Sequence, residues 1–200
     1  MKMFSNDVPH IVWAKVRNGK LVVWTGKEEM EFRHAYGRIV GIAYKVDEWN
    51  GQEFELVLVH LVHDGVRWIL SMRTDSQYFR SMVNYLFTAF TEGVLMDPLR
   101  FAPHIIEKDG KKYSAMYVSS GDKYLRAYFG RNAGEGLPEP IVTTLPNGKK
   151  FWDFSPQTKF YKEFLAQHFT AGWGDAPEDP TPTSSVLSPP PAEDPDDLPF

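Results

Sequence analysis

The sequence contains no cysteine, which excludes disulfide bonds, thiolate zinc sites and cysteine nucleophiles. It also lacks a long hydrophobic run. No stretch approaches the roughly 18 apolar residues of a membrane span, and residues 1–7 form no apolar signal region. Stability must therefore come from packing, and we expect a cytoplasmic protein with no membrane contact and no cofactor.

The last part of the chain lacks lysine and arginine. From Asp175 to Phe200 there are seven acidic residues and eight prolines. This composition buries too little apolar surface to offset the entropy lost on ordering, and like charges keep the segment extended. We expect residues 174–200 to be a disordered acidic tail, and residues 1–173 to fold as one domain.

The charge of the chain is divided unevenly between these two parts. The formal net charge is −4, but seven of the 26 acidic residues lie in the tail, so residues 1–174 have 22 basic and 19 acidic side chains, a net charge of +3. A mildly basic body with an acidic tail is typical of a nucleic-acid-binding protein whose tail can occupy the basic surface when DNA is absent.

The body shows a mainly β pattern. Asn18-Gly19 lies between β-rich runs and predicts an N-terminal hairpin, since both residues tolerate positive φ. Expected strands, in order, are 11–16, 21–24, 38–47, 52–63, 66–73, 100–107, 112–119 and 123–129. Helical spacing predicts a helix that is capped by Asp75 or Ser76 and reaches Phe90, and a second, C-terminal helix over 156–169. Residues 131–150 are expected to be loop.

Three strands, a helix and a returning hairpin follow the order of an OB-fold. That fold is a five-stranded Greek-key barrel with a helix between strands 3 and 4. The N-terminal β-hairpin, the C-terminal helix and the tail would be additions to it. An SH3-like barrel and an unrelated α+β domain share the same order and remain alternatives.

OB-folds bind single strands with aromatic platforms for bases and basic side chains for phosphates. Tyr124, Arg126 and Tyr128 alternate along one expected strand, and Trp49 lies in the turn expected to clamp the ligand. The predicted DNA-binding residues are Trp49, Arg67, Arg73, Lys111, Lys112, Tyr113, Tyr117, Lys123, Tyr124, Arg126 and Tyr128.

Sequence patterns that would indicate an enzyme are weaker than those that indicate DNA binding. His60 and His63 are three apart on an expected strand, so they point to opposite faces and do not form a metal pair. The segment 130–136 is rich in glycine but lacks the Lys-Ser/Thr of a phosphate loop. Four acidic residues around one turn could hold a divalent ion for nuclease chemistry: Asp47, Glu48, Glu53 and Glu55. We expect a protein that is not an enzyme.

The tail ends in Asp196, Asp197, Leu198, Pro199 and Phe200. This tip, after an acidic Pro-rich linker, resembles the C-terminal tip of bacterial and phage single-stranded-DNA-binding proteins. The resemblance covers only these five residues and, loosely, the tail. It implies a protein that covers single strands in replication, recombination and repair and recruits partner enzymes through the tip.

The chain also departs from the usual bacterial members of that family. Its N-terminal hairpin and residues 131–169 are additional, and its linker is short and Pro-rich. These departures favour a phage or mobile-element version, acting in a bacterial cell or an infected host as a monomer or dimer. Two other functions remain open: a decoy that copies the tip without binding DNA, and a metal-dependent nuclease.

Overall fold

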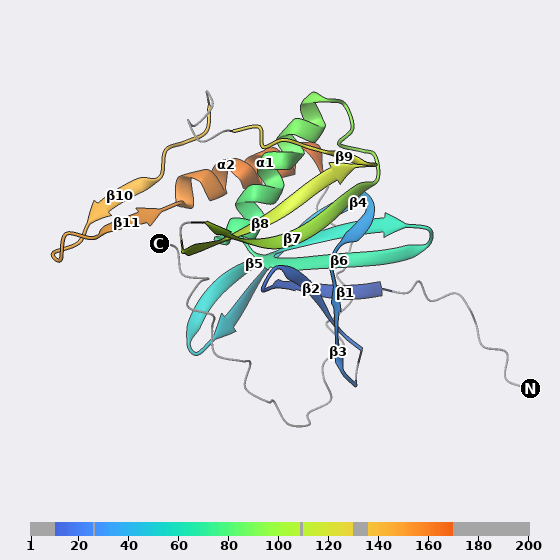
Figure 1. Ribbon diagram of the computed structural model, residues 1–200, viewed down its shortest axis with the longest axis horizontal. Helices are drawn as coiled ribbons and strands as arrows, with labels where there is room; N and C mark the ends of the chain where they lie inside the picture. The colour runs from blue at the N-terminus through green and yellow to red at the C-terminus, as the bar shows by residue number, and fades with distance from the viewer. Residues whose placement is uncertain (1–10, 26, 109, 130–135, 170–200) are drawn as a thin grey trace, which may run out of the picture.

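A computed structural model describes residues 11–25, 27–108, 110–129 and 136–169 (Figure 1). Within them the chain is mainly β, with two helices. The strands are β1 (Ile11–Arg17), β2 (Lys20–Trp24), β3 (Glu29–Phe32), β4 (Ala35–Trp49), β5 (Gln52–His63), β6 (Val66–Arg73), β7 (Leu99–Lys108), β8 (Lys111–Ser120), β9 (Lys123–Tyr124), β10 (Ile141–Thr144) and β11 (Lys150–Asp153). The helices are α1 (Gln77–Thr91) and α2 (Ser155–His168). The predicted tail and its tip lie outside the described residues.

Nine strands form one open sheet in the order β3-β2-β1-β6-β5-β4-β7-β8-β9. The pairing of β1 with β6 is parallel, and the other pairings in the sheet are antiparallel. A separate two-stranded sheet joins β10 and β11. The predicted meander β4-β5-β6 and the hairpin β7-β8 are confirmed, whereas β3, β10 and β11 were not predicted.

The described strands do not close into a barrel. In an OB-fold, the last strand pairs with the free edge of the third strand of the meander and so closes the barrel. The third strand of the meander in this chain is β6. That edge of β6 is instead paired with β1, from Ile11 opposite Arg67 to Lys15 opposite Ser71. The N-terminal hairpin therefore occupies the position at which a barrel of this order would close.

The N-terminal hairpin turns where the sequence predicted. Asn18 and Gly19 have φ values of 50° and 71°. The Gly19 backbone N–H donates to the Tyr78 hydroxyl at 2.7 Å, and a methyl group added at Gly19 would lie 3.0 Å from the Ile105 backbone nitrogen. A side chain at this position would push the turn away from β7, so glycine is required by space as well as by φ.

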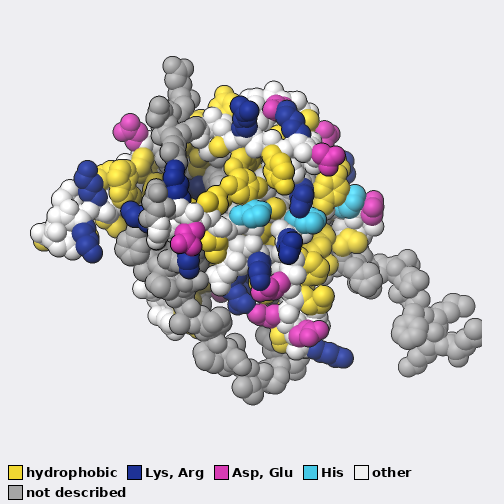
Figure 2. Space-filling view, viewed as in Figure 1, with side chains coloured by type: hydrophobic (Ala, Val, Ile, Leu, Met, Phe, Trp, Pro, Cys, Tyr) yellow, Lys and Arg dark blue, Asp and Glu magenta, His cyan; other side chains and the backbone are white. Residues whose placement is uncertain are grey.

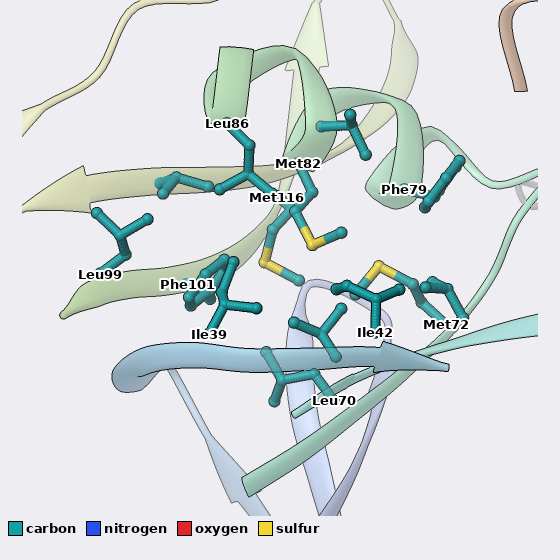
Figure 3. Packing of buried hydrophobic residues seen from close by; sticks show 14 of the residues in the cluster. Ile39, Ile42, Leu70, Met72, Phe79, Met82, Leu86, Leu99, Phe101 and Met116 are labelled. Carbon is teal, nitrogen blue, oxygen red and sulfur yellow. The ribbon is translucent and has the colours of Figure 1, made fainter. Parts of the chain in front are cut away.

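One face of the sheet packs on α1 (Figure 3). Phe79, Met82 and Leu86 point from the helix toward the sheet, where Ile39 and Leu70 are among the residues they face. All five side chains are at most 3% exposed. Burial of this apolar stripe is the main stabilising contribution to the body.

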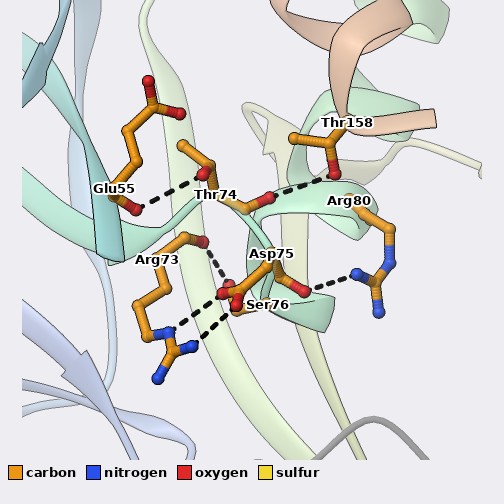
Figure 4. Close-up of polar contacts among 7 residues, drawn as sticks. All are labelled: Glu55, Arg73, Thr74, Asp75, Ser76, Arg80 and Thr158. Atoms are coloured by element: carbon orange, nitrogen blue, oxygen red, sulfur yellow. Dashed lines mark hydrogen bonds and ion pairs between the residues drawn. The ribbon is translucent and has the colours of Figure 1, made fainter. Parts of the chain in front are cut away.

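The β6–α1 junction is fixed by local polar contacts. The Ser76 hydroxyl accepts from the Phe79 N–H at 3.2 Å and donates to the Arg73 carbonyl at 2.7 Å (Figure 4). Ser76 is thus the N-cap, one of the two residues predicted from the sequence.

Helix α1 lies along one edge of β8. The Ser114 N–H donates to Gln77 Oε1 at 3.0 Å, and the Met116 N–H donates to Ser81 Oγ at 2.7 Å. Side chains of α1 therefore satisfy backbone donors that a neighbouring strand would otherwise satisfy.

The predicted strand 123–129 is wrong beyond Tyr124. Asn84 exchanges two hydrogen bonds with the Phe129 backbone, at 2.7 and 3.0 Å, and Thr88 donates to the Arg126 carbonyl at 2.7 Å. The backbone of this segment is thus bonded to α1, so only Lys123 and Tyr124 remain in the sheet.

Helix α2 begins and ends within one residue of its prediction, and aromatic rings attach it to α1. The Phe87 ring stacks on Phe164, with centroids 3.8 Å apart, and on Phe160 at 5.5 Å. This stacking places the hairpin β10-β11, which directly precedes α2, beside the main body.

We predict that Leu86→Ala lowers the free energy of unfolding by about 2–5 kcal/mol, because it leaves a cavity between α1 and the sheet. Urea denaturation of the full chain measures this change. Val46→Ala removes methyl groups from a side chain that is 63% exposed and is the control. Equal effects of the two substitutions would contradict the assigned core.

Candidate nucleic-acid interface

Side chains of the sheet alternate between the core and a second face, which we call the outer face. Arg38 of β4 lies opposite Val62 of β5, which lies opposite Arg67 of β6. Their chain neighbours Ile39 and Leu61 are part of the core. Since successive residues of a strand point to opposite faces, this row belongs to the outer face.

A second row crosses β4, β7, β8 and β9. Tyr36 lies opposite Arg100, Arg100 opposite Ser119, and Ser119 opposite Tyr124. Tyr36 is two residues before Arg38 on the same strand, so both rows share the outer face. Two separate parts of the sheet thus contribute arginines and tyrosines to one surface.

Three tyrosines, Tyr113, Tyr117 and Tyr124, lie on the outer face of β8 and β9, and we call them the tyrosine strip. Tyr113 is 43% exposed and Tyr124 is 63% exposed. Tyr117 is half-buried, with its ring centroid 5.2 Å from that of His104 and 5.7 Å from that of Tyr85. The strip therefore offers two open rings and one ring held in place by its neighbours.

Arg100 lies beside this strip with part of its guanidinium group buried. Its Nη2 is 3.4 Å from His34 Nδ1. Burial, and then the positive charge of Arg100, lower the pKa of His34, so the imidazole is held neutral next to the arginine. Within the described part of the chain, Arg100 Nε is buried without a hydrogen-bond acceptor.

Figure 2 shows Lys and Arg, histidine and hydrophobic side chains intermixed over the middle of the molecule, in the region that β4, β7 and β8 occupy in Figure 1. Basic and aromatic groups side by side are the chemistry that single-stranded nucleic acid requires, because each nucleotide has a charged phosphate and a base with a π-face.

Most of the predicted DNA-binding residues share the outer face. The strand register places seven of them there: Trp49, Arg67, Arg73, Lys111, Tyr113, Tyr117 and Tyr124. Alternation within single strands paired Tyr113 with Tyr117 and Arg67 with Arg73, and the register of the sheet then placed residues of four strands on one face.

The other four predicted residues lie elsewhere. Lys112 and Lys123 point to the helix side of the sheet, and Lys123 pairs with Glu92 at 2.7 Å. Arg126 and Tyr128 follow β9 and are not on a strand; the Tyr128 ring stacks on Phe87, with centroids 5.8 Å apart. The predicted face of Tyr124, Arg126 and Tyr128 was wrong because the strand ends after Tyr124.

Trp49 is less exposed than predicted, and Arg73 is exposed but paired with a carboxylate. Trp49 is the last residue of β4, half-buried, and the turn itself consists of Asn50 and Gly51. Arg73 forms two hydrogen bonds with the Asp75 carboxylate, at 2.6 and 2.9 Å, and its guanidinium lies 5.4 Å from the Phe54 ring centroid. The exposed tryptophan expected in a clamping loop is thus a side chain at the end of a strand.

Sequence reasoning missed several outer-face residues. They are His34, Tyr36, Arg38, Arg100 and His104. Arg38 and Arg100 alternate with core residues in strands that were predicted, so the alternation could have found them. Tyr36 lies before the predicted start of its strand, and no local pattern pairs β4 with β7.

The four acidic residues considered for a nuclease site do not all lie on the same face of the sheet. Glu48 lies opposite Glu53 on the same side of the sheet as Glu55, whereas Asp47 lies on the other side. Glu55 is bound by Lys162 at 2.7 Å. The residues that the structure describes include no group of three or more His, Asp or Glu side chains placed to hold a metal ion.

A hollow of about 720 Å³ lies on the opposite side of the body, between the β10-β11 hairpin, α2 and the β4-β5 hairpin. Lys162 lies 4.5 Å from the Tyr44 ring centroid, and burial, followed by the nearby Glu55 charge, raises the pKa of Tyr44 to about 12. Thr74 and Arg80 contribute to its wall near the β6–α1 junction (Figure 4). No local sequence pattern predicted this hollow, because its lining comes from segments far apart in the chain.

No protein-family model, curated protein or solved structure matches this chain. Neither helix within the described ranges is long and apolar enough to cross a membrane.

The middle of the outer face is apolar and buried. It contains His60, between Leu58 and Ile69, which are 4% and 3% exposed. Burial lowers the pKa of His60, so the folded protein favours the neutral imidazole.

We predict that His60 makes the fold less stable in acid. The folded state binds this proton less readily than the unfolded chain, so the stability from neutral His60 is present above about pH 6.5 and is lost as the pH falls below that value. Thermal unfolding of wild type and His60→Leu across this range tests the effect. The variant should lose less stability on acidification than the wild type. The same loss in both proteins would show that His60 is not the source of the acid sensitivity.

Proposed function

We propose that the protein binds single-stranded DNA, with little sequence preference, along the outer face of the sheet. In this proposal it protects exposed strands during replication, recombination and repair, in the cytoplasm of a bacterial cell or a phage-infected host. Its role is binding and recruitment, without catalysis and without a cofactor.

The observation that carries the proposal is the convergence of the tyrosine strip and of Arg38, Arg67 and Arg100 on one face. A base stacked on an aromatic side chain contributes about 1–3 kcal/mol, whichever base it is. Arginines along the same face would neutralise phosphates and hold the strand in register with the rings.

Arg100 supports the proposal further. Its Nε is a buried donor without an acceptor among the described residues, and an unsatisfied buried donor is costly. Because Nε itself is shielded from solvent, a phosphate would bind at the Nη2 end of the guanidinium group, which lies at the exposed contact with His34.

We also propose that the body is a variant of the OB-type fold. The order β4-β5-β6-α1-β7-β8 and the pairing of β4 with β7 support this proposal. The N-terminal strand β1 would replace the closing strand, which leaves an open sheet in place of a closed barrel.

The acidic tip 196–200 is proposed to recruit replication and repair enzymes. Its terminal Phe200 carries a carboxylate beside two aspartates, which suits an apolar pocket rimmed by arginine or lysine. This part of the proposal depends on the sequence resemblance alone.

We predict that Tyr113→Ala with Tyr124→Ala weakens binding to oligo-dT by about 1–3 kcal/mol for each stacked base lost. Fluorescence polarisation of labelled oligo-dT and of a matched duplex, over a salt series, measures the change. The logarithm of the affinity should fall with the logarithm of salt by about 0.7 per phosphate neutralised.

Tyr128→Ala is the matched control for this experiment. Tyr128 is 49% exposed, similar to the strip tyrosines, but lies on the helix side against Phe87. Its substitution should leave DNA affinity unchanged. If Tyr128→Ala weakens binding as much as the double substitution, the wrong face was chosen; if the wild type binds no oligonucleotide even without its tail, the decoy function is favoured.

We predict that deleting residues 194–200 leaves DNA binding intact or stronger, because it removes negative charge, and abolishes capture of enzymes that recognise such tips. Polarisation and co-precipitation from a bacterial extract, each with the full chain as reference, measure the two effects. Enzyme capture that survives the deletion would refute the role of the tip.

A further inference from the structure

The hairpin β10-β11 stands apart from the nine-stranded sheet. Its strands pair only with each other among the described residues, from Ile141 opposite Asp153 to Thr144 opposite Lys150. In Figure 1 it extends from the end of α2, on the left of the molecule. Every residue from 141 to 152 is exposed. An isolated two-stranded hairpin is only marginally stable in water, so this one needs a further contact.

Each face of the hairpin carries two large apolar side chains. The register places Ile141 and Phe151 on one face, and Val142 and Trp152 on the other. These four side chains are between 37% and 56% exposed. Large exposed apolar groups on both sides of a projecting ribbon are characteristic of a surface that another protein covers.

The hollow beside the hairpin has matching chemistry. Tyr44, Phe154 and Ala166 give it apolar walls, and it is about 720 Å³ in volume, enough to receive several side chains. The Glu55–Lys162 ion pair also contributes to its lining.

Charges on the hairpin and around the hollow are complementary. Lys149 and Lys150 follow the hairpin turn and are exposed. Asp153 and Glu163 lie at the hollow, and hydrogen bonds from the Ser155 hydroxyl and backbone N–H lower the pKa of Asp153 and keep it ionised. The lining of the hollow has four acidic side chains, Glu55, Asp75, Asp153 and Glu163, and three basic ones, Arg80, Lys159 and Lys162. This net negative charge would attract the lysines of a second hairpin.

We propose that the hairpin and the hollow form a two-fold interface between two copies of this chain, with the hairpin of each copy packed in the hollow of the other. Because one chain carries both complementary surfaces, a two-fold axis pairs the hairpin of each copy with the hollow of the other. The dimer then has two equivalent contacts and no unpaired hairpin or hollow. The inference does not depend on DNA binding.

Sedimentation equilibrium of the full chain over a wide concentration range tests the interface. The wild type should form a dimer. Phe151→Ser with Trp152→Ser should raise its dissociation constant at least about 10-fold, since buried aromatic anchors dominate such interfaces. Trp24→Ser, which changes an equally large side chain that is 64% exposed on β2, should not alter it. A monomeric wild type, or a dimer unaffected by the double substitution, would overturn the proposal.

Cross-linking provides a second readout that does not require disrupting the hairpin. Because the sequence has no cysteine, Thr143→Cys and Ala166→Cys each create a single reactive site. A short bifunctional maleimide added to a mixture of the two variants should link them into a dimer. A mixture of Thr143→Cys with Asp122→Cys, in the turn after β8, should not be linked. Equal yields in the two mixtures would overturn the proposed packing.

Discussion

The parallel pairing of β1 with β6 is the constraint on which the rest of the fold depends. It occupies the strand edge at which a barrel of this order would close, and it brings the N-terminal turn against Tyr78 and the Ile105 backbone. On the edge of β8, side chains of Gln77 and Ser81 from α1 accept hydrogen bonds from the strand backbone. The resulting outer face is buried around His60 and carries exposed tyrosines on β8 and β9.

That outer face brings together groups that are distant in the chain. Tyr36, Arg100 and Tyr124 come from three strands and form one row only because β4 pairs with β7 and β8 pairs with β9. Rigid strands are suited to holding such groups at fixed spacing, as a ligand with a regular backbone requires. The hairpin β10-β11 and its hollow lie on a different part of the molecule, so DNA binding and self-association could occur together.

The sequence allowed the local elements to be predicted where turn chemistry and periodicity agreed. Asn18-Gly19, the meander from β4 to β6, and Ser76 before α1 are examples, because each depends on neighbouring residues. Predictions failed where distant contacts decided the outcome. Asn84 and Thr88 bind the backbone after Tyr124 and end the strand, and the parallel partner of β1 could not be read from its own residues. For the candidate site, alternation grouped Tyr113 with Tyr117, but only the pairing of β4 with β7 added Tyr36.

Photo-cross-linking of the full chain to oligo-dT that contains 4-thiothymine tests the central claim most directly, since it identifies the side chains in contact with bases. The account predicts that cross-links fall on the peptides that contain Tyr113, Tyr117 and Tyr124. Cross-links confined to α2 or to the β10-β11 hairpin, with none on β8 or β9, would contradict it.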